Sequence, residues 1–583
     1  MVDDDTESRP DADLSTTRGG GSMNPRRKKL LAKLFLVFVM PAMFFMAVEG
    51  VLRILPLDFE TEPAVKIEGS TASFTEETIN NERYYVASNE SFRPPKIKIP
   101  RDKQQGAFRI VSIGGSASNG LPHAVGNSYL DYLQDLFVQN LPDQNVEVYN
   151  FGGSGFASYR LRTFIGQIEQ LQPDLVIIYS GNNEFVEARR YATRSGMTWR
   201  IRQFIVKTRI GQLLSRSILQ TKQIVLNNTV EIAVYDDTIQ KKASNLRAEP
   251  GQTEIVLSEY EDNIRAIIDE ALGWQVPVLL FTIPANLRDW RPHVSFSKSE
   301  GPERVKWLQD FTRGRGCFFD GEYKEAEVAF RKVISVEPLH AESCYFLGRA
   351  LEMQGQKESS FDMYLQAKEL DYGPFRALNV INETLRKIAG EKEQVYLVDL
   401  EREFISCAEG VAPGFDLFVD YCHPTYRGNR IIANKSFERI VADNLLGISG
   451  LTSDESAIQY YDLRETEPDS VGQYTWNKLF AWYVVLHQHE AIIALSNKLQ
   501  TVEEGMIAQG TRNHIARWAA VLAEYEEFKN GKYPVKPWVD QAELKKFSVH
   551  LDFKRLYHEM IRKSQRENGL PDHKLPWLRD EVY

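Results

Sequence analysis

The sequence predicts an α/β protein built around a parallel β-sheet. Apolar runs with the length of buried strands recur along the chain, at residues 108–113, 146–149, 175–179, 276–282 and 394–398. Helical patterns lie between them, among them 159–171 and 259–272. This alternation of strands and helices is typical of βαβ units. Three of the runs end in turns rich in glycine and asparagine, at the strand ends where open α/β sheets build their sites.

The composition describes a large globular chain with an acidic excess. With 583 residues, 43% of them apolar, the chain has room for about four domain-sized units. The formal net charge of −10 argues against a nucleic-acid-binding face, which is usually basic. The four cysteines imply no disulfide framework. Cys407 and Cys422 flank one loop and would pair only in an oxidising compartment, and buried free thiols are the alternative.

The N-terminus predicts a tail and a membrane anchor. Residues 1–29 are polar and are expected to be a disordered cytoplasmic tail. The basic cluster 26–29 precedes the apolar run 30–48, whose only charge is Lys33, and this length approaches the ~20 residues that span a bilayer. By the positive-inside bias the basic cluster keeps the tail in the cytoplasm. We therefore expect residues 30–55 to anchor the chain in the membrane and the rest of the chain to lie on the periplasmic or extracellular side. A cleaved signal peptide is the alternative, but no small-x-small site follows the run.

A polar connecting arm is predicted over residues 56–106, with weak strand signals at 84–86. The α/β domain would begin at residue 107. Its first strand runs into FRIVSIGGSASNG, residues 108–120, where Gly114 and Gly115 permit a tight turn that a Cβ would obstruct. This turn leaves Ser116 at the carboxyl end of the strand, before a helix predicted over 129–138. Alone, such a serine is more often part of a simple βα turn than a nucleophile.

A phosphate-binding loop is the rival interpretation of this glycine-rich turn. The Walker pattern needs a Lys-Ser/Thr pair that is absent here, and G-x-G-x-x-G does not occur in the turn. We therefore expect no cofactor.

Three further motifs follow in order along the chain. They are VEVYNFGGSG at 146–155, DLVIIYSGNNE at 174–184 and DYCHP at 420–424. Each has an ordinary explanation when taken singly: turn glycines, an asparagine that caps a helix, and a loop histidine before a proline. These three motifs and the turn at 108–120 each stand at the end of a strand or in a loop. Together the four segments resemble the four sequence blocks of the SGNH (GDSL-like) hydrolases.

This resemblance implies a three-layer α/β/α, flavodoxin-like domain with a Ser-His-Asp triad. It also implies an oxyanion hole made by the serine N–H, a glycine N–H and an asparagine side chain. The residues that match the family's catalytic positions are Ser116, Gly152, Asn183, Asp420 and His423.

The residue types suit acyl transfer independently of the resemblance. A serine hydroxyl needs a base to take its proton, and a neutral imidazole needs a carboxylate to fix its tautomer. Asp420 and His423 are three residues apart and fit within one turn. One departure from the family is plain, because Gly115 stands where its motif has Asp before the serine. Since that Asp is not the triad acid, the chemistry is left intact.

Two helical insertions are predicted to interrupt the hydrolase domain, which would span 107–302 and 373–448. The first, 186–257, is both apolar and basic. It would cover the active site, lie on a membrane surface or pack as an amphipathic helix.

The second insertion, 303–372, repeats with a period of 34. The spacing relates Gly314 to Gly348 and Phe330 to Tyr364, and resembles tetratricopeptide repeats, with an ordinary helical hairpin as the alternative. Such repeats would recruit a protein partner. We expect the ends of this insertion to lie close together, so that a Gly/Ser linker replacing 314–371 leaves small-ester turnover intact.

The C-terminal region, 449–583, shows helical patterns with aromatic residues that are best explained as packing. His487 and His489 are two positions apart and would face different sides of a helix, so no metal site is expected there.

The sequence thus predicts a membrane-anchored serine esterase that acts on an ester-linked acyl group of an envelope glycan or lipid. An O-acyltransferase using the same site is one alternative, because the acyl group passes to water or to a sugar hydroxyl. A non-catalytic scaffold at the membrane is another. The intact set of Ser, Gly, Asn, Asp and His argues against the scaffold.

Overall fold

The structure is a computed structural model and describes residues 73–89, 91–186, 251–299, 301–448 and 458–463, together with Met40 and Leu495. The predicted tail therefore lies outside the described residues. The same holds for most of the predicted anchor, most of the insertion 186–257 and most of the region 449–583. None of the helices in the described ranges is both long and apolar enough to cross a membrane.

A five-stranded parallel sheet is the centre of the described part of the chain, which confirms the predicted sheet. Its strands lie in the order β5-β4-β6-β7-β8, and every neighbouring pair is parallel. Their bounds are β4 Ala107–Gly114, β5 Asn145–Gly152, β6 Leu175–Tyr179, β7 Val278–Phe281 and β8 Val395–Val398. Gly114 pairs with Gly152 on one side and with Tyr179 on the other, so the turns after β4, β5 and β6 begin level with one another.

The strands β4, β6 and β7 were detectable in the sequence because they are covered on both faces. All five residues of β6 are buried, and β4 is buried except at Phe108. A parallel strand in such an environment is a continuous apolar run rather than an alternating one.

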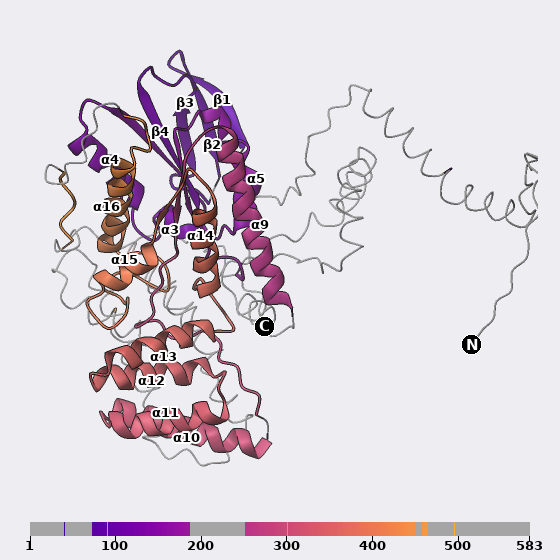
Figure 1. Ribbon diagram of the computed structural model, residues 1–583, viewed down its shortest axis with the longest axis vertical. Coiled ribbons are helices and arrows are strands. Elements are labelled where there is room, and N and C mark those ends of the chain that lie inside the picture. The colour runs from indigo at the N-terminus through magenta and orange to yellow at the C-terminus, as the bar shows by residue number, and fades with distance from the viewer. Residues whose placement is uncertain are drawn as a thin grey trace, which may run out of the picture. The chain divides into compact units, whose positions relative to one another are not determined.

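Helices pack in two groups beside the sheet (Figure 1). In one group α4 (Tyr129–Asn140) contacts α16 (Tyr426–Ala442). In the other group α9 (Gln252–Gly273) contacts both α5 (Ser158–Ile165) and α14 (Asn379–Glu391). The remaining short helices are α3 (Ser116–Asn119), the 3-10 turn η2 (Glu169–Leu171) and α15 (Leu400–Cys407).

Two predicted helices differ from the observed ones. The helix expected over 159–171 ends at Ile165, where Gly166 follows as its C-cap, and resumes only as the 3-10 turn. The helix expected from 259 begins at Gln252, after Gly251, whose φ of +80° stops it from extending further towards the N-terminus.

The predicted connecting arm contains a three-stranded antiparallel sheet instead of weak strand signals alone. Its strands are β1 Ser73–Ile79, β2 Glu82–Ser88 and β3 Lys96–Pro100. Asn80 and Asn81 join β1 to β2 with φ of 52° and 68°, the pair of positive angles that a tight hairpin turn needs. β3 alternates buried and exposed residues, as a strand with one covered face does.

Four helices follow β7 in the segment for which repeats were predicted. They are α10 Gly301–Phe319, α11 Tyr323–Val336, α12 Ala341–Met353 and α13 Lys357–Glu369. Each packs on the next, and they enclose an apolar core of their own that includes Phe311, Phe330, Phe346 and Tyr364. Figure 1 shows them stacked as a separate set of helices.

The period of 34 has a structural basis in these helices. A Cβ on Gly314 would lie 2.9 Å from the Phe330 ring, and one on Gly348 would lie 3.1 Å from the Tyr364 ring. Each glycine thus lets an aromatic ring of the next helix approach closely. The turns inside the two helix pairs also match, because Gly321 and Gly355 have φ of +81° and +76°.

Candidate active site

Ser116 is the first residue of α3, directly after the turn that ends β4. Its side chain is almost entirely buried. A Cβ on Gly114 would lie 2.3 Å from the Tyr179 carbonyl oxygen, and one on Gly115 would lie 2.9 Å from Asn183 Nδ2. Gly114 therefore leaves no room for a side chain, as expected from the sequence, and Gly115 lies in close contact with the Asn183 amide. As the first residue of a helix, Ser116 has an N–H without an intrahelical acceptor.

The structure brings Ser116, His423 and Asp420 together. Ser116 Oγ lies 2.8 Å from His423 Nε2, and His423 Nδ1 lies 2.6 Å from Asp420 Oδ2. All three side chains are more than nine-tenths buried. Because an ionised carboxylate only accepts hydrogen bonds, Nδ1–H is the donor to Asp420, and Nε2 is left to accept the Ser116 hydroxyl proton.

The loop 420–423 orients this carboxylate locally. Asp420 Oδ1 accepts the backbone N–H groups of Cys422, at 2.9 Å, and His423, at 2.8 Å. This turn uses one carboxylate oxygen for the backbone and leaves Oδ2 for the imidazole. The three-residue spacing seen in the sequence is what allows both contacts.

Asn183 lies beside the nucleophile turn, after β6. Its Nδ2 donates to the Phe156 carbonyl oxygen at 3.0 Å. A side-chain amide nitrogen has two hydrogens, so one remains for another acceptor. Nδ2 lies close to Gly115, and Asn183 and Ser116 line the same pocket.

Gly152 packs closely against α3. Its N–H donates to Asn150 Oδ1 at 2.9 Å, and its carbonyl oxygen accepts Asn119 Nδ2 at 2.6 Å. The N–H that was predicted to serve the oxyanion hole is thus already donated in this structure, so that role for Gly152 stays a prediction. Gly155, with φ of +74°, directly precedes Phe156 and is a second candidate for the glycine donor.

Asn286, a buried residue in the loop after β7, was not predicted as part of the site. Its Nδ2 donates to the Asp420 carbonyl oxygen, and its backbone N–H donates to the Tyr421 carbonyl oxygen, both at 3.0 Å. Asn286 therefore fixes the loop that carries the Asp-His pair. Because it acts on backbone atoms 134 positions away, no local motif surrounds it.

A small pocket lies beside Ser116. Among the residues that line it are Ala117, Ser180, Gly181, Asn182 and Ile283. The hydroxyl of Ser180 is buried and has no hydrogen-bond partner among the described residues. The pocket thus offers the nucleophile a confined space with apolar and polar walls.

Asp420, Cys422 and His423 form the one group of three side chains in the described ranges with the spacing of metal ligands. Burial raises the pKa of the Cys422 thiol well above its usual value, which favours the neutral thiol over the thiolate that binds metals. Asp420 Oδ2 and His423 Nδ1 are also hydrogen-bonded to each other. The cluster fits a triad better than a metal centre, and all four cysteines of the chain are free.

No protein-family model matches the sequence, and no curated protein is significantly similar to it. Solved structures do resemble it. An acetyl xylan esterase is 15% identical over 57% of this chain and 98% of its own, with a TM-score of 0.26. A GDSL-like lipase from Bacteroides thetaiotaomicron is 11% identical over 60% of this chain and 91% of its own, with a TM-score of 0.25. An acetylxylan esterase from Geobacillus stearothermophilus is 16% identical over 59% of this chain and 97% of its own, with a TM-score of 0.26.

Proposed function

We propose that this protein is a serine hydrolase of SGNH type that cleaves an ester-linked acyl group. One observation supports this above all others, the continuous hydrogen-bonded series Asp420–His423–Ser116 at 2.6 and 2.8 Å. In this assignment Ser116 is the nucleophile, His423 the general base and Asp420 the group that orients the imidazole. The domain that carries them is an α/β/α hydrolase domain interrupted by the helices α10 to α13.

The reaction has two halves. Ser116 Oγ attacks the ester carbonyl carbon while its proton passes to His423 Nε2, and the alcohol then leaves with that proton. The acyl group is now bonded to Ser116. A water molecule attacks the acyl-enzyme, gives its proton to Nε2, and the carboxylic acid departs as Ser116 recovers its proton.

Negative charge develops on the carbonyl oxygen in both halves. The N–H of Ser116 and the second hydrogen of Asn183 Nδ2 are the donors that we assign to this oxyanion. Each donor of this type is worth a factor of ~10²–10³ in rate, because it acts once the charge has formed.

The location of the substrate is a further part of the proposal. The basic cluster 26–29 followed by the apolar run 30–48 supports a single anchor with the hydrolase domain outside the cytoplasm. An acyl ester on an envelope glycan or lipid is then the substrate class within reach.

The test is hydrolysis of p-nitrophenyl acetate by the purified full-length chain. We expect Ser116→Ala to abolish turnover while the variant keeps the circular dichroism spectrum and unfolding midpoint of the wild type. A fluorophosphonate probe should label the wild type once, and the label should map to Ser116. Turnover that survives in Ser116→Ala would refute the assignment.

A further inference from the structure

Arg376 is a buried arginine outside the triad that is connected through Asn286 to the loop that carries His423. Arg376 belongs to the segment between α13 and α14, and its side chain is 1% exposed. Its NH2 lies 3.6 Å from Oδ2 of Asp371, which is equally buried. Burying a charged side chain costs free energy unless the charge is paired and its N–H groups donate hydrogen bonds. The groups that accept these hydrogen bonds therefore show which part of the fold Arg376 stabilises.

The guanidinium binds the loop after β7. Arg376 NH1 donates to two carbonyl oxygens, those of Asn286 and Trp290, each at 2.9 Å. One nitrogen thus joins two points of the loop 286–290. Asn286 in turn donates to the carbonyl oxygens of Asp420 and Tyr421. A series of hydrogen bonds therefore runs from Arg376 through Asn286 to the Asp-His pair.

Aromatic packing supports the same loop. The Tyr421 ring lies against Trp290 and Phe375, with centroid distances of 5.6 and 5.5 Å. The Tyr421 ring also contacts the His423 ring, edge to face at 5.7 Å. A shift of the segment 371–377 would therefore reach the catalytic base by two routes, the hydrogen bonds and this packing.

The same segment also reaches the oxyanion side of the site. The N–H of Ala377 donates to Asn182 Oδ1 at 3.1 Å, and Asn182 directly precedes Asn183. Arg376 and Ala377 are adjacent residues. Two neighbouring positions thus contact the supports of both the base and the proposed oxyanion donor.

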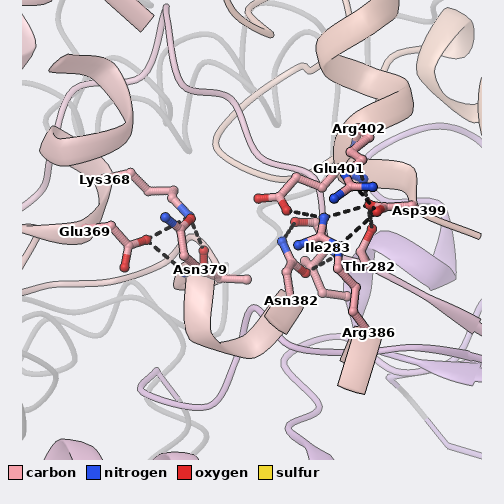
Figure 2. A network of polar contacts seen from close by, with 11 residues as sticks. Thr282, Ile283, Lys368, Glu369, Asn379, Asn382, Arg386, Asp399, Glu401 and Arg402 are labelled. Atoms are coloured by element: carbon pink, nitrogen blue, oxygen red, sulfur yellow. Dashed lines mark hydrogen bonds and ion pairs between the residues drawn. The ribbon is translucent and has the colours of Figure 1, made fainter. Parts of the chain in front are cut away.

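The last helix of the repeat insertion fixes this segment. Lys368 Nζ, near the end of α13, donates to the Ala377 carbonyl oxygen and to Asn379 Oδ1, each at 2.8 Å. Glu369 accepts the N–H of Asn379 at 2.9 Å, as Figure 2 shows. Asp371 accepts three backbone N–H groups, those of His293, Val294 and Gly373.

We propose that Arg376 is a positioning residue for the catalytic base, acting through Asn286 on Asp420 and His423, and that the insertion α10 to α13 is the platform that holds it. The inference rests on the proposed esterase function. It also changes the role of the insertion, which becomes a support of the site as well as a surface for a partner.

The experiment is a double-mutant cycle on the full-length chain with Arg376→Lys, Asn286→Ala and the pair. Arg376→Lys keeps the charge beside Asp371 and loses the bridge between the two carbonyl groups. We expect each single variant to lower kcat for p-nitrophenyl acetate about 10- to 100-fold with KM nearly unchanged, because a misplaced base slows chemistry rather than binding. The double variant should be scarcely worse than the poorer single, since both changes break one pathway.

Arg386→Lys is the matched control. Arg386 also lies on the α14 side and donates to Asp399 and Glu401, in the network on the right of Figure 2. Among the described residues its hydrogen bonds and ion pairs go to Asp399 and Glu401 and not to the loop 420–423. We expect this variant to lower the unfolding midpoint and to leave kcat unchanged.

The outcomes separate the inference from the proposed function. A wild type that neither turns over esters nor reacts with fluorophosphonate refutes the function. If the wild type is active but Arg376→Lys and Asn286→Ala lower kcat no more than Arg386→Lys does, the positioning role is refuted. It is also refuted if the loss in the double variant equals the sum of the two single effects in free energy. The proton NMR resonance of His423 Nδ1–H gives a readout that needs no turnover: it should shift in Asn286→Ala and stay in place in Arg386→Lys, and an unmoved resonance would also overturn the inference.

Discussion

Ser116 Oγ and His423 Nε2 lie 2.8 Å apart although 307 positions separate the two residues in the chain. Ser116 follows β4, which lies between β5 and β6 in the sheet, and His423 comes from the loop before α16. The contact therefore exists only when β4, the loop after α15 and the helix α16 that follows it are all in place. It is a sensitive report on the assembly of the whole domain.

His423→Ala should be as damaging to kcat as Ser116→Ala. Nucleophile and base act as one unit, so the double variant should be no slower than either single variant. Burst-phase and steady-state assays with p-nitrophenyl acetate measure this. A double variant that is slower by the product of the two single effects would show that the residues act independently.

Asn183→Ala should lower kcat by about 10²–10³ with little change in KM, because its donor matters once charge develops on the oxyanion. Asn434→Ala is the matched control, since that asparagine makes two hydrogen bonds to the Tyr461 backbone and lies outside the site. An increase in KM alone for Asn183→Ala would instead assign the amide to substrate binding.

The stability of the insertion should fall at mildly acidic pH. Burial lowers the pKa of His340 below its ordinary value of 6.5, although Glu342 and Glu337 oppose the shift. As the pH falls through 6.5, the unfolded chain gains a proton that the folded chain binds less readily, so this contribution is present above that pH and is lost below it. His293 is buried and its pKa is lowered in the same direction.

His340→Asn tests this dependence. His340 caps α12 by accepting the N–H of Ser343, and asparagine is also a good N-cap residue. Thermal unfolding between pH 7.5 and 5 should show a shallower loss of stability in the variant than in the wild type, with His293 contributing the remainder. Equal slopes would contradict the assignment.

Two deletions distinguish a passive insertion from a supporting one. Replacing 314–371 by a linker removes Lys368, Glu369 and Asp371, so small-ester turnover should fall, contrary to the expectation from the sequence. Deleting 321–354 removes one repeat length, joins α10 to α13 at Gly355, and keeps the contacts to Ala377. This shorter deletion should retain most of the turnover, provided that both proteins are folded by circular dichroism. The opposite ranking would restore the idea of a separable module.

The membrane anchor is tested by topology. A reporter that is active only outside the cytoplasm, fused after Tyr583, should be active, and replacement of residues 26–29 by acidic residues should impair or invert insertion. A soluble cytoplasmic chain would overturn both the anchor and the envelope substrate.

The parts of the fold that the sequence predicted are those with a local signature. The strands β6, β7 and β8 are continuous apolar runs, and the Asp420–His423 pair fits in one turn. The repeat pattern in α10 to α13 was detectable because Gly314 and Gly348 each leave room for an aromatic ring, 34 residues apart. In each case the cause and the pattern lie within a short stretch of chain.

The parts that were missed depend on contacts between distant segments. Asn286 and Arg376 bind backbone carbonyl groups, and a carbonyl group leaves no trace in the sequence. The N–H of Gly152 is donated to Asn150, which spacing alone does not reveal. The first hairpin has a local signal in the sequence, the Asn80-Asn81 pair that forms the turn between β1 and β2.

Gly115 has a consequence for how this site changes over evolution. A side chain at position 115 would meet Asn183 Nδ2 at 2.9 Å and the Phe156 carbonyl oxygen at 3.3 Å. The residue at position 115 therefore packs against the asparagine loop and the turn after β5, and an Asp there needs a small displacement of the Asn183 side chain and of that turn. Relatives with Asp before the nucleophile should accordingly hold the asparagine side chain slightly further from that residue, and the Gly of this chain is a change of packing rather than the loss of a catalytic group.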